Sequence, residues 1–115
     1  MTNHPLLNAY LTASGAYPQR ANHPELTSEL LNNANSLLTK VQQLFEELGL
    51  KLDKYKFSSG FRPTDVNALV PNAAKKSLHS ICLAVDIVDD KGQSLAKLMQ
   101  SAKAIKIRLK LGIFL

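Results

Sequence analysis

The sequence has one cysteine, no tryptophan and no long apolar run, and each absence excludes a class of protein. The single thiol, Cys82, rules out an internal disulfide framework and suits synthesis in a reducing cytoplasm. No stretch of about 18 apolar residues exists, so no membrane span is predicted. The start, MTNHPLLNAYL, lacks a basic segment and a long apolar one, so no signal peptide is expected. The length of 115 residues predicts a single domain, 1–115.

Acidic residues are few in the second half of the chain, which makes the charge uneven. Residues 1–50 have a balance of −2, whereas residues 51–115 carry twelve Lys and Arg against five Asp, a balance of +7. A basic half attracts polyanions such as nucleic acid, anionic lipid, or teichoic and peptidoglycan carboxylates. The alternative is a solvated basic face. Aromatic residues are not interleaved with the cations, so a dedicated single-strand nucleic-acid binder is not indicated.

The clearest periodicity covers residues 25–49 and predicts the main helix. Apolar residues fall at three- and four-residue steps, which is typical of an amphipathic helix. Thr27 or Ser28 is expected to cap its start, and Gly49 suits the left-handed position after its end.

Residues 1–24 hold three of the five prolines and are predicted to be irregular, apart from a helical turn around Leu6–Leu11. Tyr10 and Tyr17 are expected to anchor this segment to the core. His4 and His23 each precede a proline, and we expect them to be structural or exposed to solvent.

The rest of the chain predicts a small antiparallel sheet and further helices. After residue 90 a helix is expected from Ser94 to about Leu109, although the alternation of apolar and basic residues from Ile105 also fits a strand. The fold class is therefore α+β, with N-terminal helices packed on a small, incomplete sheet. In order, the other predicted elements are a strand at 54–58 ended by Gly60, a helix at 64–69 after Pro63, a loop at 73–78, a strand at 83–88 and a turn at 89–92.

Two residues of the segment 50–90 are of the types that bind Zn²⁺. His79 offers an imidazole nitrogen and Asp86 a carboxylate oxygen. In a strand, Asp86 would lie between apolar neighbours, where a carboxylate is costly unless it is paired or bound to a metal. The alternatives are a loop histidine without a role, and an Asp86 that is exposed at a strand end or paired with Lys75, Lys76 or Arg62.

Three further residues of this segment could serve a site. Arg62 lies in a rigid Ser-Gly-Phe-Arg-Pro turn, which suits bidentate binding of a carboxylate, although a surface arginine is the alternative. Ser77 could form hydrogen bonds near His79. Cys82 could be a soft ligand, but its apolar neighbours favour a buried, inert thiol.

Together these residues resemble the pattern of a known family. Ser59-Gly60-Phe61-Arg62-Pro63, then Val66-Asn67, then Ser77-x-His79 followed by Ala84-x-Asp86-Ile87, is similar to the motifs of the M15 zinc peptidases. That family includes D-alanyl-D-alanine carboxypeptidases, related dipeptidases and phage endolysins that cut peptidoglycan stems. The segment from His23 to Ala34 also resembles the first helix of a phage and bacterial branch, so the likeness covers about residues 20–100 and suggests a phage or prophage origin.

The resemblance implies roles for four residues. His79 and Asp86 match two zinc ligands, Arg62 matches the arginine that holds the substrate carboxylate, and Ser77 matches a residue of the same pocket. The implied activity is zinc-assisted hydrolysis of a peptidoglycan peptide, with a glutamate as general base.

The chain departs from the family pattern in two places. Cys82 replaces a glycine, which would strain the loop if that glycine allows an unusual backbone angle. No Glu or His follows Asp86, so the general base and third zinc ligand are absent from these 115 residues, and a C-terminal truncation and impaired activity are expected. The alternatives are a non-catalytic peptidoglycan-binding module and a basic nucleic-acid-binding domain, although no nucleic-acid-binding motif is present.

Overall fold

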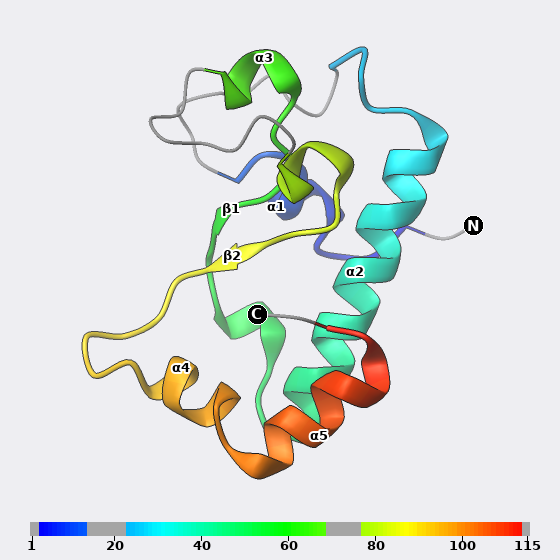
Figure 1. Cartoon of the computed structure of the whole chain (residues 1–115). Coiled ribbons are helices and arrows are strands. Elements are labelled where there is room, and N and C mark those ends of the chain that lie inside the picture. The colour runs from blue at the N-terminus through cyan, green and yellow to red at the C-terminus, as the bar shows by residue number, and fades with distance from the viewer. Residues whose placement is uncertain (1–2, 14–22, 69–76, 114–115) are drawn as a thin grey trace.

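The long helix α2 (Ser28–Glu47) runs along one side of the molecule, and α1, η2 and α5 pack against it (Figure 1). The computed structural model describes residues 3–13, 23–68 and 77–113. The elements in chain order are α1 (Leu7–Leu11), α2 (Ser28–Glu47), the 3₁₀ helix η2 (Leu52–Lys54), β1 (Phe57–Ser59), α3 (Thr64–Asn67), the 3₁₀ helix η3 (Leu78–Ile81), β2 (Asp86–Ile87), α4 (Ser94–Met99) and α5 (Ala102–Leu111).

Local signals define both ends of α2, as predicted. The Thr27 hydroxyl accepts a hydrogen bond from the Leu30 amide at 3.3 Å, which satisfies one of the free amides of the first turn. Gly49 has a φ of +77° just after the helix, where a side chain would be strained. The helix is shorter than the predicted range because the first residues of that range form turns around Pro24 and Glu25.

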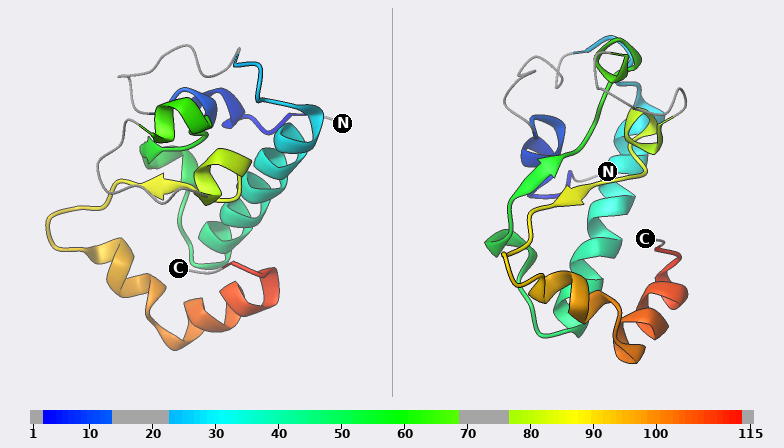
Figure 2. Two further views of the ribbon diagram at one scale, coloured as in Figure 1. Left: turned by 45° about the horizontal axis from the view of Figure 1, so that its top comes forward. Right: turned by 60° about the vertical axis from the view of Figure 1, so that its left-hand side comes forward.

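The core lies between α2, α1 and the two strands. Tyr10 of α1, Leu38 and Phe45 of α2, and Phe61 are almost fully buried. Figure 2 shows α1 and the sheet on the same flank of α2, whereas α4 and α5 lie near its C-terminal end. Tyr10 therefore anchors the N-terminal segment as predicted, whereas Tyr17 lies outside the described residues.

The sheet among the described residues consists of β1 and β2, which pair in antiparallel fashion. Phe57 lies opposite Ile87 and Ser59 lies opposite Asp86, so β1 contains one more residue than β2 between these two pairs. Such an irregularity bends a strand and changes the direction of its side chains. Both strands are shorter than predicted, because η2 takes up Lys54 and residues 83–85 have no regular structure.

The C-terminal part contains two helices where one was predicted. Ser101 has an extended backbone, with φ −66° and ψ 153°, and its hydroxyl accepts from the Ala104 amide at 3.2 Å. This cap starts α5 and ends the continuity with α4. The alternative strand from Ile105 is wrong, because Ile107 and Leu111 lie on the helix face that packs against the core.

The fold class is α+β, as predicted, and no described helix is long and apolar enough to cross a bilayer. The predicted helix at 64–69 ends at Asn67, and the predicted loop at 73–78 lies mostly outside the described residues. Its last residue, Leu78, instead begins η3, so the candidate ligand His79 lies on a 3₁₀ turn.

Candidate metal site

Gly60 lies between β1 and the candidate site, at a position where a side chain would clash with α1. A Cβ at Gly60 would lie 2.0 Å from the carbonyl oxygen of Tyr10, well inside van der Waals contact. This close approach brings the turn after β1 against the backbone of α1. The carbonyl of Gly60 then points to the candidate ligand His79, whose ring lies 19 residues further along the chain.

Two hydrogen bonds fix the position of His79. The hydroxyl of Ser77 caps η3 by accepting from the His79 amide at 3.1 Å. The ring nitrogen Nδ1 lies 2.8 Å from the Gly60 carbonyl oxygen, and only 11% of the side chain is exposed. Because a carbonyl only accepts, Nδ1 carries the proton, and a neutral ring presents the lone pair of Nε2 on its other side.

Asp86 lies on that other side. Its Oδ2 is 3.4 Å from Nε2 of His79, so the structure brings the two predicted ligands together. The carboxylate is 59% exposed, which corrects the expectation of an apolar environment. The physical reason is the short, irregular strand pair, which leaves Asp86 at the end of β2. Of the alternative partners, Lys75 and Lys76 lie outside the described residues.

This pair fits a metal ion. A neutral His79 and an ionised Asp86 place two lone pairs opposite each other, which is favourable only with a cation between them, either a proton or a metal. Two ligands of a tetrahedral Zn²⁺ with bonds of about 2.0–2.1 Å lie about 3.3–3.4 Å apart. A metal-binding imidazole usually donates the N–H of its other ring nitrogen to a carbonyl or carboxylate, as Nδ1 of His79 does to Gly60. The imidazole and the carboxylate can therefore serve as two of the ligands of a Zn²⁺ ion.

Tyr10 and Cys82 support the loop between these two ligands. The Tyr10 hydroxyl donates to the Ala84 carbonyl at 2.9 Å, two residues before Asp86. Cys82 is fully buried beside Tyr10 and has a φ of +59°, so the position that is a glycine in the family pattern has the left-handed backbone that glycine favours. Burial raises the pKa of the Cys82 thiol to about 11 despite the opposing hydrogen bond with Tyr10. The predicted inert thiol is thus favoured over a metal ligand.

Arg62 lies next to this pair in the fold. Its amide donates to the His79 carbonyl at 3.1 Å, which places the start of its side chain beside η3. The side chain is half-buried, and its Nε is buried without a hydrogen-bond partner among the described residues. The planar guanidinium of a half-buried arginine beside the ligand pair suits bidentate binding of a carboxylate.

The other two histidines are structural, as predicted. In His4, Nδ1 accepts from the Leu6 amide at 3.0 Å, and Nε2 is paired with the side-chain oxygen of Gln42. In His23, Nδ1 accepts from the Glu25 amide at 3.1 Å, and Nε2 lies 3.1 Å from Oδ2 of Asp65. Because an amide only donates, both rings carry their proton on Nε2 and use both nitrogens within the fold.

Residues 3–13, 23–68 and 77–113 contain no group of three or more His, Cys, Asp or Glu side chains placed to hold a metal.

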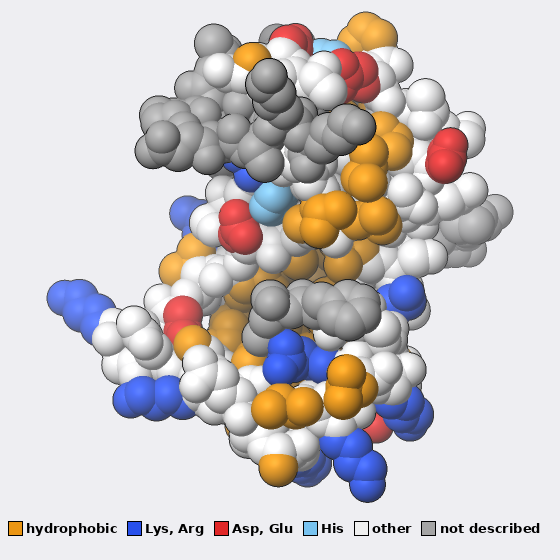
Figure 3. Space-filling view, viewed as in Figure 1, with side chains coloured by type: hydrophobic (Ala, Val, Ile, Leu, Met, Phe, Trp, Pro, Cys, Tyr) orange, Lys and Arg blue, Asp and Glu red, His pale blue; other side chains and the backbone are white. Residues whose placement is uncertain are grey.

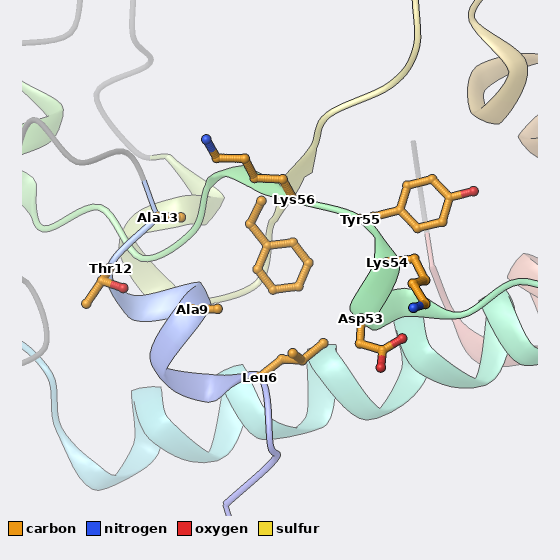
Figure 4. Close-up of a pocket in the computed structure, with 9 residues that line it drawn as sticks. Leu6, Ala9, Thr12, Ala13, Asp53, Lys54, Tyr55 and Lys56 are labelled. Carbon is orange, nitrogen blue, oxygen red and sulfur yellow. The ribbon is translucent and has the colours of Figure 1, made fainter.

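A hollow of about 500 Å³ lies elsewhere, between α1 and residues 53–57 (Figure 4). Ala9 of α1 and Leu6 just before that helix line one side of it, and Tyr55 and Lys56 line the other side from the segment before β1. Neither candidate ligand lines this hollow, because the buried His79 lies on η3 and the exposed Asp86 lies on β2.

A histidine with its outer nitrogen free, opposite a carboxylate and beside an arginine, is the kind of site that a metallopeptidase uses. The comparison with known families agrees with this class: the family model described as Peptidase M15 matches residues 11–114, and the chain belongs to that family. A peptidase-like function that acts on a peptide-containing substrate follows from this membership. No curated protein and no solved structure matches the chain.

The structure also assigns supporting positions that the sequence did not reveal. Gly60 was expected only to end a strand, and Tyr10 only to anchor the first segment. Both contact the loop of the candidate ligands, through the Gly60–His79 and Tyr10–Ala84 hydrogen bonds. The glycine in the Ser-Gly-Phe-Arg pattern was the one signal that could have identified the first of these contacts.

Proposed function

We propose that the chain is a zinc-binding domain of the peptidase class directed at peptidoglycan stem peptides. The observation that supports this most directly is the His79–Asp86 pair, with Nε2 and Oδ2 3.4 Å apart and Nδ1 bound to the Gly60 carbonyl. His79 and Asp86 would hold the zinc ion, which supplies a Lewis acid that polarises the scissile carbonyl and activates water.

Other residues of the chain would bind and orient the substrate. The guanidinium of Arg62 suits the terminal carboxylate of a stem peptide, because its planar fork matches a carboxylate and its backbone amide is bonded to the carbonyl of His79. Ser77 retains a hydroxyl proton that it could donate, since its oxygen accepts from His79. Leu78 and Ile81 are exposed and lie three residues apart on η3, so they share one face beside the ligand pair and suit small apolar side chains.

We infer that these 115 residues alone bind zinc weakly and hydrolyse little. The four glutamates all precede the site in the sequence, at 25, 29, 46 and 47, and none follows Asp86. A catalytic zinc site normally has three protein ligands, and the described residues supply two. Without a general base near the scissile bond, activation of water would also lose about 10²–10⁴-fold in rate.

The test is calorimetric titration of the metal-free protein with zinc. The wild-type chain should bind one zinc ion weakly, and His79→Ala should abolish this binding. His23→Ala is the matched control, since His23 is also paired with an aspartate but uses both ring nitrogens in the fold. Zinc binding that survives in His79→Ala would disprove the assignment.

A non-catalytic peptidoglycan-binding module is the second candidate, and the position of Arg62 beside His79 favours it equally. Sedimentation with purified cell wall, combined with a zymogram, separates the two functions. Retention that depends on Arg62, without clearing in the zymogram even at saturating zinc, would support binding alone. Clearing that disappears in His79→Ala would support the peptidase.

A further inference from the structure

The C-terminal helices carry positive charge without any compensating acid of their own. From Lys91 to the end, the sequence contains six Lys and Arg residues and no Asp or Glu. Four of these cations lie on α5, a helix of ten residues. On the neighbouring α2, Glu46 already accepts from Gln42 within the helix at 3.0 Å. Figure 3 shows Lys and Arg side chains gathered with hydrophobic ones over the part of the surface where Figure 1 places α4 and α5.

The exposed face of α5 is divided into two stripes. At about 100° per residue, Lys103, Lys106 and Lys110 fall within an arc of about 60°. Ile105 and Leu109 fall about 40° apart on the adjoining arc. All three lysines are exposed, and Ile105 and Leu109 are 40% and 69% exposed. A lysine stripe therefore lies beside an apolar stripe on the outer side of the helix.

The fold does not require this outer face. The inner side of α5 packs through Ala104, which is fully buried, and through Ile107 and Leu111. The cap at Ser101 and the left-handed Gly112 define the ends of the helix independently of the outer residues. Exposed apolar side chains next to clustered lysines, on a helix that is already anchored from behind, indicate a surface available to a partner.

We propose that the outer face of α5 docks onto an anionic lipid bilayer. A cationic stripe is attracted to anionic headgroups, and an adjoining apolar stripe enters the boundary between headgroups and acyl chains. Charge complementarity alone would equally suit nucleic acid. The adjoining Ile105 and Leu109 favour lipid, because phosphate backbones offer no apolar surface for them. This surface acts independently of the zinc site and of the proposed hydrolysis.

The experiment is flotation of the full 115-residue chain with vesicles. Vesicles of phosphatidylcholine and phosphatidylglycerol should bind it, and vesicles of phosphatidylcholine alone should not. Replacing all three stripe lysines, Lys103, Lys106 and Lys110, by Glu should lower the partition coefficient by about a hundredfold or more. Ile105→Ser combined with Leu109→Ser should lower it by about tenfold, since the apolar contribution is lost while every charge remains.

A matched control separates this face from general positive charge. Lys51, Lys54 and Lys56 are exposed outside α5, and their change to Glu alters the net charge equally. This control should keep most of the binding, and so should His79→Ala. Equal loss in the control, or serine variants that bind as tightly as the wild type, would overturn the proposal. Binding to duplex DNA that exceeds binding to the anionic vesicles would overturn it in favour of nucleic acid.

Discussion

The molecule contains two His–Asp pairs, and they differ in what the histidine does with its second nitrogen. His23 and Asp65 are 3.1 Å apart, and His79 and Asp86 are 3.4 Å apart. In the first pair Nδ1 accepts from a backbone amide, so Nε2 carries a proton and donates to the carboxylate. In the second pair Nδ1 donates to the Gly60 carbonyl, so the neutral form of the ring presents the lone pair of Nε2 to the carboxylate.

The partner of Nδ1 therefore decides whether Nε2 of a neutral histidine donates to the carboxylate or is able to bind a metal. The His23 pair is complete without any ligand, and it joins the segment before α2 to α3, where Glu25 also accepts from the Thr64 amide at 2.9 Å. The His79 pair is complete only with a proton or a metal between its two atoms. Two His–Asp pairs with similar N–O distances therefore have different hydrogen-bonding roles at Nε2.

The largest effect on stability is expected from Gly60→Ala, at the residue whose carbonyl accepts from His79. The new Cβ would lie 2.0 Å from the Tyr10 carbonyl oxygen, so α1 and the turn after β1 must separate. We expect a loss of more than about 3 kcal/mol in the free energy of unfolding, measured by urea denaturation. Gly49→Ala is the control: nothing lies within 4 Å of its Cβ, and only the left-handed backbone costs about 1–2 kcal/mol. Equal losses in the two variants would contradict the assigned packing.

The buried thiol near the His79 pair predicts a loss of stability at alkaline pH. The pKa of Cys82 rises from 9.0 to about 11 on folding, so the unfolded state releases its proton first. Its contribution is complete below pH 9 and is lost as the pH rises toward 11, by about 2–3 kcal/mol. Burial also raises the pKa of Tyr10, which adds to the loss at higher pH. Urea unfolding across this range should show the decline, and Cys82→Ala should remove its part between about pH 9 and 10.

The sequence predicted what local chemistry determines. Thr27 and Gly49 define the two ends of α2, because a cap and a left-handed residue each affect only the adjacent turn of a helix. An unusual backbone angle at Cys82 was anticipated because a glycine occupies that position in the family pattern, and the structure shows that the angle is left-handed. The break at Ser101 was missed, because the apolar spacing continues through it and only the cap geometry shows that α5 starts there.

The sequence predicted which residues form the candidate site, but neither the tautomer of His79 nor the exposure of Asp86. His79 and Asp86 were singled out by residue type, spacing and family resemblance, and the structure brings them together. The ring tautomer depends on the Gly60 carbonyl, a contact across 19 residues that no local pattern encodes. The exposure of Asp86 depends on the extra residue in β1, which periodicity along β2 alone does not reveal.

A smaller effect is expected from Tyr10→Phe, which removes one hydroxyl and keeps the packed ring. The Ala84 carbonyl would lose its donor at 2.9 Å, which costs about 1–2 kcal/mol of stability. Because Ala84 precedes Asp86 by two residues, we also expect weaker zinc binding by calorimetry. Tyr55→Phe is a matched control, since Tyr55 is half-buried against Phe45, with ring centroids 5.2 Å apart, and away from the site. Unchanged zinc affinity in Tyr10→Phe would limit this residue to the core.

Cys82 also allows a test of the left-handed backbone that holds the ligand loop. Cys82→Gly and Cys82→Ala both lose the buried thiol, but only alanine keeps the strain of a φ of +59°. We therefore expect the glycine variant to be more stable than the alanine variant by about 1 kcal/mol in urea unfolding. At most positions the order is reversed. An alanine variant that is more stable would show that the loop relaxes to another conformation.

The smallest changes in stability are expected when the carboxylate of each His–Asp pair is replaced by an amide. In metal-free protein, Asp86→Asn replaces an acceptor with a group whose N–H can donate to the lone pair of Nε2, so stability should rise by about 0.5 kcal/mol. Zinc affinity should nevertheless fall at least about tenfold, because the anionic ligand is lost. Asp65→Asn keeps an oxygen acceptor for His23 and is 68% exposed at its side chain, so it should change stability by less than about 0.5 kcal/mol and leave zinc binding intact. If Asp86→Asn destabilises the metal-free protein as an ordinary broken ion pair does, His79 is protonated there and the two pairs are alike after all.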